Sequence, residues 1–270
     1  MALNPPVVLI FSASDPSGGA GLQGDLLTLS SMGCYVLSVV TAITVQDTAG
    51  VSDVMALDSE WINDQARAVL EDMPVAAFKI GLMGSVDNIA AIAEVVGDYP
   101  DIPLILDPVL RSGRGEELTD DEMISALEHM LIPQTTLLTP NSWEARRIAY
   151  GEDSDRALDQ CASKLLAMGC EYVLITGTHE QTPEVCNTLY GQSGIVRQDC
   201  WQRLGNNYHG SGCTLASAIT ASIAHGLDLT EAVREGQEYT WSALKAGLRL
   251  GMGQLIPDRL FWAREEDGDD

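Results

Sequence analysis

The stretch that most constrains the fold is residues 208–219, which read YHGSGCTLASAI. Its small residues Gly210, Ser211 and Gly212 lead directly into a helical pattern that begins at Cys213. Unpaired backbone N–H groups and the dipole of a helix N-terminus stabilise phosphate or a developing anion, so the stretch predicts an anion hole. A cysteine in the first helical turn is expected to have a lowered thiol pKa, which makes Cys213 a candidate catalytic base. An ordinary helix cap after a tight turn is the alternative that this loop alone leaves open.

Short apolar runs alternate with amphipathic segments along the whole chain. Strands are expected at residues 7–11, 35–45, 76–80, 103–106, 135–138 and 172–175, with an antiparallel pair at 185–190 and 194–203. Helices are expected at residues 21–32, 59–71, 86–96, 118–131, 142–150, 154–168, 213–225 and 230–248. This alternation is typical of an α/β fold with a mostly parallel central sheet and helices on both faces, here with an antiparallel edge hairpin. Residues 1–270 are expected to form a single domain, with about 262–270 as a flexible acidic tail.

Composition excludes several classes of partner. The 270 residues carry a formal net charge of −24, which disfavours binding to nucleic acid and to anionic membranes. No apolar run is long enough to span a bilayer, and no signal peptide is recognisable, so a cytoplasmic location is expected. The six cysteines show no CxxC pair and no zinc-ligand spacing, and they are expected to be reduced thiols.

Polar residues follow the ends of several expected strands. These residues are Asp107, Asn141, Glu144, Thr176 and Thr178. Because the carboxyl ends of parallel strands meet at one rim, we expect these side chains to lie near the helix that begins at Cys213, and to form an active site there. Asn141 and Glu144 also fit a capping box, a structural role that is compatible with binding a phosphate and a hydrated Mg²⁺.

Two further segments are candidates for substrate contacts. Residues 14–25, SDPSGGAGLQGD, follow the first expected strand and enter a helix, although they match neither the dinucleotide nor the Walker pattern. Asp25 falls about one turn into that helix, where it accepts hydrogen bonds from a substrate hydroxyl or amine, or else lies exposed on an ordinary connection. Gln46, at the end of the second strand region, offers a donor and an acceptor to a heterocycle edge, whereas a plain polar loop is the alternative.

These segments together resemble the hydroxymethylpyrimidine/phosphomethylpyrimidine kinases of thiamine biosynthesis, which have the ribokinase-like fold. The resemblance runs over nearly the whole chain, and its segments fall in family order. It rests on DPSGGAG at residues 15–21 with Asp25, on Gln46 with Thr48 and Gly50, on KIGL at 79–82, on DPV at 107–109, on TPN at 139–141 with Glu144, and on HGSGC at 209–213.

The resemblance implies ATP- and Mg²⁺-dependent phosphorylation of a small molecule, 4-amino-5-hydroxymethyl-2-methylpyrimidine, and of its monophosphate. It implies that Gln46 and Asp25 recognise the pyrimidine and its hydroxymethyl group, in a pocket lined by Ala20 and Leu82. It implies that residues 210–213 surround the transferring γ-phosphoryl group, with Cys213 where related sugar kinases use an aspartate base. The metal is assigned to Asp107 and Glu144, and the nucleotide to Asn141, Thr176 and Thr178. The family also suggests a homodimer.

One departure from the family concerns the nucleotide. The family often has lysine where Thr176 stands and glycine where Thr178 stands, and Gly24 replaces a frequent alanine. We hypothesise that Arg111 and Arg114 supply the missing cation by closing over phosphate as a lid. A pyridoxal/pyridoxine kinase of vitamin B6 salvage is the alternative within the same class of enzyme. A non-catalytic pyrimidine or nucleotide sensor is the alternative from another class, and a redox protein that uses Cys213 lacks a nearby resolving cysteine.

Overall fold

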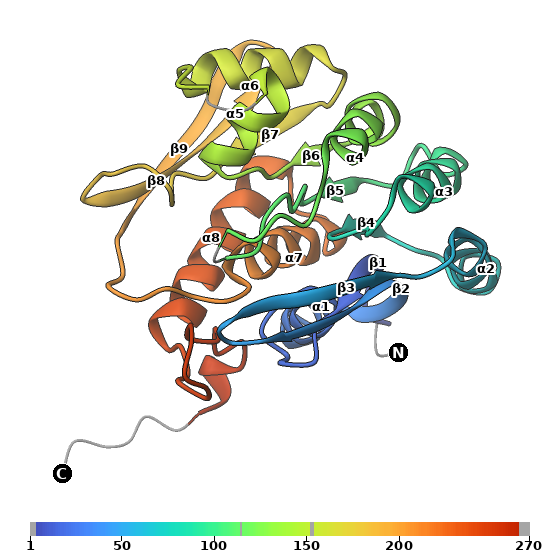
Figure 1. Ribbon diagram of the computed structural model, residues 1–270, viewed down its shortest axis with the longest axis horizontal. Helices are drawn as coiled ribbons and strands as arrows, with labels where there is room; N and C mark the ends of the chain where they lie inside the picture. The colour runs from blue at the N-terminus through green and yellow to red at the C-terminus, as the bar shows by residue number, and fades with distance from the viewer. Residues whose placement is uncertain (1–3, 114, 152–153, 265–270) are drawn as a thin grey trace.

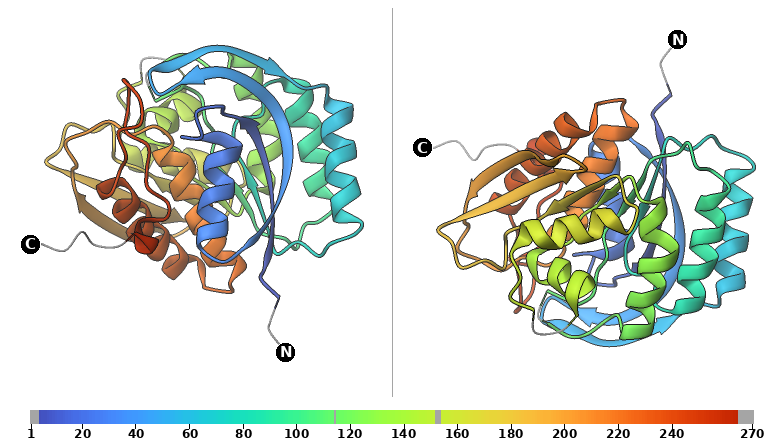
Figure 2. Two further views of the ribbon diagram at one scale, coloured as in Figure 1. Left: turned by 90° about the horizontal axis from the view of Figure 1, so that it is seen from below. Right: turned by 90° about the horizontal axis from the view of Figure 1, so that it is seen from above.

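The computed structural model describes residues 4–113, 115–151 and 154–264. Within these residues one nine-stranded sheet has the order β3-β2-β1-β4-β5-β6-β7-β8-β9 (Figure 1). Helices α1, α7 and α8 lie on one face of the sheet, and α2 to α6 lie on the other (Figure 2). The expected α/β architecture with helices on both faces is therefore confirmed.

The strands divide into a parallel centre and two antiparallel edges. From β2 to β7 all neighbours in the sheet are parallel, whereas β3, β8 and β9 each run antiparallel to their neighbours. The bounds are β1 Val7–Ser14, β2 Tyr35–Asp47, β3 Gly50–Ala56, β4 Ala77–Ile80, β5 Leu104–Leu106, β6 Leu137–Leu138, β7 Tyr172–Ile175, β8 Glu184–Gly191 and β9 Gly194–Gln202.

The helices connect the strands and provide the outer layers. Their bounds are α1 Gly21–Ser31, α2 Ser59–Leu70, α3 Val86–Gly97, α4 Asp121–Ala126, α5 Ser142–Tyr150, α6 Leu158–Ala167, α7 Ser211–Ala224 and α8 Leu229–Lys245. A π turn, η1 Leu127–Leu131, continues α4, and short 3-10 turns follow at η2 Ile132–Gln134 and η3 Phe261–Ala263. The last turn occupies part of the expected flexible tail, and residues 265–270 of that tail lie outside the described residues.

Side chains on successive strand residues alternate between two cores. On one face Leu9 and Phe11 join a large cluster with α2 to α6, while Val8 and Ile10 pack against α1 and α7 on the other. Strands that are buried on both sides read as continuous apolar runs, which is why they were recognisable from the sequence. No helix in the described part of the chain is both long and apolar enough to cross a membrane.

The largest difference from the expected elements is β3, which the sequence reading did not include. None of its residues is buried and exposed residues alternate irregularly with half-buried ones, so they carry no clear hydrophobic period. The Asp47 side chain accepts hydrogen bonds from the backbone N–H groups of Ala49 and Gly50, and these bonds close the turn between β2 and β3. A smaller difference lies at Ser154, whose hydroxyl accepts from the N–H of Arg156 in a turn. As a result α6 begins only at Leu158, because such local bonds compete with helix formation.

The expectation that all cysteines are reduced thiols is wrong for one pair. Cys186 on β8 and Cys200 on β9 lie directly opposite each other in the antiparallel ladder and form a disulfide. Hairpin register decides this pairing, and the spacing of cysteines along the sequence does not reveal register. Cys34, Cys161, Cys170 and Cys213 are free thiols.

Candidate active site

The carboxyl ends of the parallel strands meet at one rim, and the start of α7 lies among them. A Cβ atom built on Gly212 would lie 3.9 Å from Oδ2 of Asp107, which follows β5. The backbone N–H of Ser142 donates to the carbonyl oxygen of Thr176 at 2.9 Å, so the ends of β6 and β7 are joined beside the same rim. The structure thus places Asp107 beside the start of α7, and Thr176 beside the start of α5.

The anion-hole loop, residues 209–213, packs directly against the loop that follows β1. Gly210 has a φ of 82°, and a Cβ atom there would lie 1.9 Å from the carbonyl oxygen of Gly19. Only glycine combines this left-handed conformation with such a close backbone approach. Gly210 therefore fixes the junction between two segments that the sequence treats as separate motifs.

The loop that follows β1, residues 15–20 and here called the substrate loop, is held by Asp15. One carboxylate oxygen of Asp15 accepts from Nε2 of His209 and from the N–H of Ala20, both at 2.8 Å, and the other accepts from the N–H of Ser17. Burial alone would raise the pKa of Asp15, but the hydrogen bonds from His209, Ser17 and Ala20 outweigh it and hold the pKa at about 2. Asp15 is therefore ionised and pins the substrate loop to the anion-hole loop.

A buried ion pair lies beneath the two loops. Lys79 on β4 donates to Oδ2 of Asp25 at 2.8 Å, Ser217 on α7 donates to Oδ1 at 2.8 Å, and both charged side chains are 0% exposed. Burial alone would lower the pKa of Lys79, but the charges of Asp25 and Asp107 and the hydrogen bond to Asp25 raise it, so Lys79 stays a cation. Asp25 was expected to contact substrate, yet both of its oxygens bind protein groups and none of its surface is exposed.

Lys79 is the functional residue that the sequence reading left without a role. The sequence does point to this residue, since a lysine occurs within the short apolar strand β4. A lysine is almost never fully buried unless it is paired, so its position predicts an acidic partner. The same reasoning does not name Asp25, because the two residues are 54 positions apart.

The thiol of Cys213 does not have the lowered pKa that its place in the helix predicts. Burial raises the pKa of Cys213 to about 12, and the charges of Asp107 and Asp25 add to the rise. The cation of Lys79 and a hydrogen bond from the N–H of Gly21 oppose it. In this structure the thiol is therefore protonated, and the charge of Lys79 is the largest effect that favours the thiolate.

The expected metal residues are two buried carboxylates. Burial raises the pKa of Asp107 to about 6, while Lys79 opposes the rise and Asp25 adds to it. Burial and the charge of Asp107 raise the pKa of Glu144 to about 7. Two neighbouring buried carboxylates repel each other, and their hard oxygen atoms are the ligands that Mg²⁺ prefers, so the residues fit a divalent cation.

Glu144 also has the structural role that its spacing allows. Its backbone N–H donates to Oδ1 of Asn141 while its own carboxylate accepts from the N–H of Asn141, both at 2.9 Å, which completes a capping box on α5. Its other carboxylate oxygen accepts from the N–H of Leu110 at 3.1 Å. Glu144 thus ties the segment after β5 to the start of α5.

The expected pyrimidine-binding residues lie on β2, in the substrate loop and after β4. Leu82, at the end of β4, packs in a small apolar cluster with Ala13 and Ala42, which Val109 borders. Ala20 is half-buried in the substrate loop, and Gln46 is half-buried near the end of β2. Ala20, Gln46 and Leu82 come from three separate segments, and their role in a heterocycle pocket stays a prediction.

The nucleotide-side loop, residues 176–182, is fixed by side chains that the sequence reading missed. Arg203 donates to the carbonyl oxygens of Thr178, Glu180 and Thr182 at 2.8–2.9 Å. Asn187 accepts from the N–H of Gly177 at 3.1 Å. Thr178 itself is exposed. The loop is therefore shaped by the β8–β9 hairpin that packs against it.

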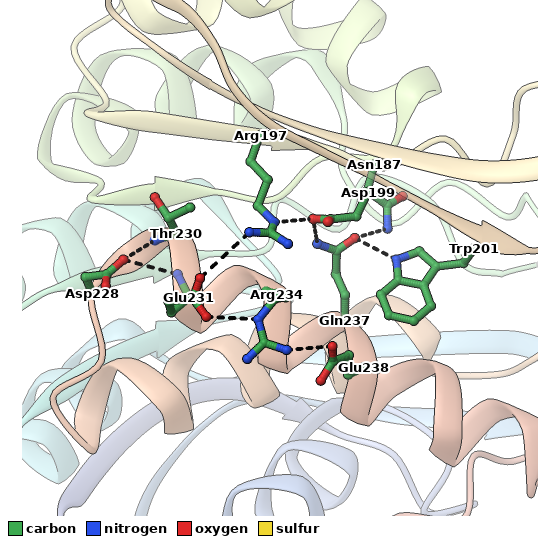
Figure 3. Close-up of polar contacts among 10 residues, drawn as sticks. All are labelled: Asn187, Arg197, Asp199, Trp201, Asp228, Thr230, Glu231, Arg234, Gln237 and Glu238. Atoms are coloured by element: carbon green, nitrogen blue, oxygen red, sulfur yellow. Dashed lines mark hydrogen bonds and ion pairs between the residues drawn. The ribbon is translucent and has the colours of Figure 1, made fainter.

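Behind Asn187 a buried polar network joins the hairpin to α8 (Figure 3). Asn187 and Trp201 both donate to Oε1 of Gln237, at 2.9 and 3.0 Å, and Gln237 donates to Asp199 at 2.9 Å. Because Gln237 is 2% exposed, these bonds satisfy its polar atoms in the protein interior. Their members are scattered over 50 residues of sequence, and nothing in their spacing indicates that they meet.

Arg111, one of the two expected lid cations, is already engaged. Its guanidinium donates to Glu117 at 2.8 Å and lies 3.9 Å from the ring centre of Trp143, in the first turn of α5. Arg114 lies outside the described residues. A cavity of about 620 Å³ opens beside this segment, between Gly113, residues 205–207, Arg249 and residues 252–254, and none of the expected site residues that the structure describes lines it.

Comparison with known proteins agrees with the fold and identifies the family. The family described as phosphomethylpyrimidine kinase matches residues 15–258. The hydroxymethylpyrimidine/phosphomethylpyrimidine kinase of Mycobacterium tuberculosis is 35% identical over 262 residues, which is 96% of this chain and 95% of that protein.

Two solved structures show the same ribokinase-like architecture. The phosphomethylpyrimidine kinase of Clostridium difficile superposes with a TM-score of 0.76 at 36% identity, over 88% of this chain and 99% of that chain. The Staphylococcus aureus pyridoxal kinase, in complex with ADP, superposes with a TM-score of 0.87 at 27% identity, over 97% of this chain and 96% of that chain. Taken with the segments that meet at the rim, these matches show that the chain belongs to the phosphomethylpyrimidine kinase family.

Proposed function

We propose that this protein transfers the γ-phosphoryl group of ATP to the hydroxymethyl oxygen of 4-amino-5-hydroxymethyl-2-methylpyrimidine, and then to the phosphate of the monophosphate, in thiamine biosynthesis. The observation that carries the proposal is the junction of Gly210 with Gly19, which sets an anion hole against the substrate loop. Phosphoryl transfer depends on positioning and on neutralising charge more than on covalent chemistry. A rigid junction of this kind supports both requirements.

On the acceptor side, Gln46 reads the polar edge of the pyrimidine, and Ala20 and Leu82 contact its ring. Asp25 acts indirectly in our proposal, because its oxygens already bind Lys79 and Ser217. It holds Lys79 in place, and Lys79 supplies positive charge next to Cys213. Cys213 orients the attacking hydroxyl. Its thiol first gives up its proton to solvent, which the charge of Lys79 favours, and the thiolate then accepts the hydroxyl proton as the oxygen bonds to phosphorus and ADP leaves.

On the donor side, the backbone N–H groups of residues 210–213 surround the transferring phosphoryl group. Asn141, Thr176 and Thr178 contact the nucleotide phosphates, with Arg111 and Arg114 closing over them. Asp107 and Glu144 would hold Mg²⁺, which would neutralise charge on the phosphate oxygens. ATP as the donor is supported by the related pyridoxal kinase, whose structure contains ADP.

We further propose a homodimer in the cytoplasm. The β2–β3 arm supports this proposal, because β3 is an edge strand and its surroundings expose Ile43, Val45 and Met55, of which Val45 is 62% exposed. A second copy that pairs with this edge would cover these side chains. Light scattering should give a molar mass twice that of the monomer for the wild-type protein. The Val45→Glu variant should have the molar mass of a monomer.

A second candidate function is phosphorylation of pyridoxal. The S. aureus pyridoxal kinase, solved with pyridoxal bound, has a TM-score of 0.87 to this chain, above that of the C. difficile phosphomethylpyrimidine kinase. Both substrates present a hydroxymethyl group on a heteroaromatic ring, so the same acceptor side suits either. A sensor without turnover is a third candidate, which the absence of lysine at Thr176 favours.

One assay separates the three candidates. Hydroxymethylpyrimidine, its monophosphate and pyridoxal are each incubated with ATP, Mg²⁺ and the protein, and the products are weighed by mass spectrometry. We expect a monophosphate and then a diphosphate from the pyrimidine. Product from pyridoxal alone would assign the chain to vitamin B6 salvage, and ligand binding without any product would support the sensor.

A further inference from the structure

Arg259 enters the site from the segment that follows α8. It is a charged side chain that is only 3% exposed, and it lies between α1 and the first turn of α7. One guanidinium nitrogen donates to the carbonyl oxygen of Gly19 at 2.6 Å, and Nε donates to Oγ1 of Thr214 at 3.2 Å. Gly19 belongs to the substrate loop, and Thr214 follows Cys213.

The two hydrogen-bond acceptors of Arg259 lie on opposite sides of the junction between Gly19 and Gly210. Gly19 is the residue whose carbonyl oxygen approaches Gly210 most closely. On the other side the Thr214 hydroxyl donates to the carbonyl oxygen of Gly210 at 2.8 Å. The guanidinium therefore contacts the substrate loop directly and the anion-hole loop through one hydroxyl, so it spans the closest approach of the two.

The chain makes room for this arginine at Gly24. A Cβ atom on Gly24 would lie 2.9 Å from a terminal nitrogen of Arg259 and 3.4 Å from its Cζ. Gly24 lies within α1, where glycine is less favourable than alanine. The space that Arg259 occupies gives this glycine a physical reason.

The backbone around Arg259 is also held in place. The Tyr239 hydroxyl, on α8, donates to the carbonyl oxygen of Arg259 at 2.7 Å and lies 2.5 Å from the Ser31 hydroxyl at the end of α1. The N–H of Asp258 donates to the carbonyl oxygen of Ala243 at 2.9 Å. The guanidinium is thus presented from a fixed base, and a planar fork of this kind loses little further freedom when it binds two acceptors.

We infer that Arg259 is a positioning residue for phosphoryl transfer, admitted by Gly24, which keeps the substrate loop and the anion-hole loop at a fixed separation. This inference rests on the proposed kinase function. The guanidinium works through Gly19 and through Thr214, and it does not contact the reacting atoms. Its loss lets the acceptor and the anion hole drift apart, and misplacement by about 1 Å costs up to ~10²-fold in rate.

The first test replaces the guanidinium by an apolar side chain of similar length, Arg259→Met. We expect kcat to fall at least tenfold at 15 °C, well below the unfolding transition, while KM for the pyrimidine changes less than threefold. Arg264→Met is the matched control, since Arg264 belongs to the same segment but binds only Asp258, and its kcat should stay within twofold of wild type. A purely structural role would lower Tm and leave kcat at 15 °C unchanged, which would overturn the inference.

The second test uses Gly24→Ala, because the added methyl group needs the space of the guanidinium. In the wild-type background we expect Gly24→Ala to lower kcat by a similar factor as Arg259→Met. In the Arg259→Met background the same change should have no further effect on kcat. The inference would be overturned if the fold-losses in kcat of the two single variants multiply in the double variant. It would also be overturned if Gly24→Ala alone leaves kcat unchanged.

Thermal unfolding keeps this result separate from the proposed function. Gly24→Ala should lower Tm in the wild-type background and raise it in the Arg259→Met background, with a coupling of about 2 °C or more. If the wild-type protein phosphorylates none of the three compounds, the proposed function fails while the coupling in Tm still stands. Additive changes in Tm would instead show that Arg259 does not occupy the space at Gly24.

Discussion

The acceptor side and the nucleotide side of the rim differ in how their charges are held. On the acceptor side Asp15, Lys79 and Arg259 are buried, and each binds a named partner on another segment. On the nucleotide side Arg203 is partly exposed and binds backbone carbonyl groups, among them that of Thr178, which is itself exposed. The acceptor side is therefore already organised in the free protein.

This difference indicates which side of the site is preorganised by the protein and which side is completed by bound ligands. A hydroxyl group must be held within a narrow range of positions for attack, so buried ion pairs and close glycine contacts are useful there. Nucleotide phosphates bring their own charge and a metal ion, so exposed side chains and backbone amides can adapt to them. Changes on the acceptor side should therefore have larger effects than changes on the nucleotide side.

The largest effect is expected from Cys213→Ala, at the centre of the acceptor side. Removing a group that accepts a proton in the transition state typically costs ~10²–10⁴-fold in rate, and we expect kcat to fall within that range. Circular dichroism and Tm should show a folded protein, because Cys213 is not part of a core cluster. A variant that turns over at the wild-type rate would remove Cys213 from the mechanism.

The next effect is expected from Lys79→Met, which leaves Asp25 buried without its cation. Breaking a buried ion pair on one side costs about 3–5 kcal/mol, so urea denaturation should show a loss of that order. The double change Lys79→Met with Asp25→Leu should recover much of the stability while kcat stays low. A single variant that loses less than about 1 kcal/mol would mean that the pair is not organising this side.

A smaller effect is expected from the low pKa of Asp15. Its ordinary pKa is 3.8 and the folded-state pKa is about 2, which corresponds to about 2 kcal/mol of stability. Because the folded-state pKa lies below the unfolded-state one, this stability is fully present above about pH 4 and is lost as the pH falls toward 2. Asp15→Asn should show a flatter fall of the unfolding free energy between pH 5 and pH 2.5, and identical slopes for the two proteins would contradict the assignment.

The smallest effect is expected on the nucleotide side, from Thr176→Lys. An exposed cation beside a phosphate contributes about 1 kcal/mol, so KM for ATP should fall about fivefold with little change in kcat. Adding Arg111→Ala to this variant should then have less effect than it has in the wild type, because the new lysine supplies the same charge. If Thr176→Lys changes kcat more than Cys213→Ala does, the contrast between the two sides is wrong.

The sequence predicts the parallel centre of the sheet well because its strands are buried on both faces. The strand ends that carry Asp107, Asn141 and Thr176 follow from that pattern, since parallel strands present their carboxyl ends together. The exposed strand β3 was missed because exposure removes the hydrophobic period. A cap formed by neighbouring residues, such as the one at Asn141, was therefore predictable from the sequence. A strand at the protein surface, such as β3, was not.

Partners that meet through the fold were not predictable from the sequence. Asp25 looks like a substrate ligand on its own helix, and only the packing of α1 against β4 and α7 shows that Lys79 and Ser217 occupy it. The pKa of Cys213 was misjudged for the same reason, because burial under two loops outweighs the field of a helix N-terminus. The pairing of Cys186 with Cys200 depends on hairpin register.

The bond between Arg259 and Gly19 also has a consequence for how the protein folds. The two residues are 240 positions apart, so this contact closes almost the whole chain into one loop. Contacts of such long range form slowly, because loop-closure entropy is lost before the contact is gained. During refolding the central strands should regain their circular dichroism signal early, and enzymatic activity should return only in the last phase, when the two ends of the chain meet.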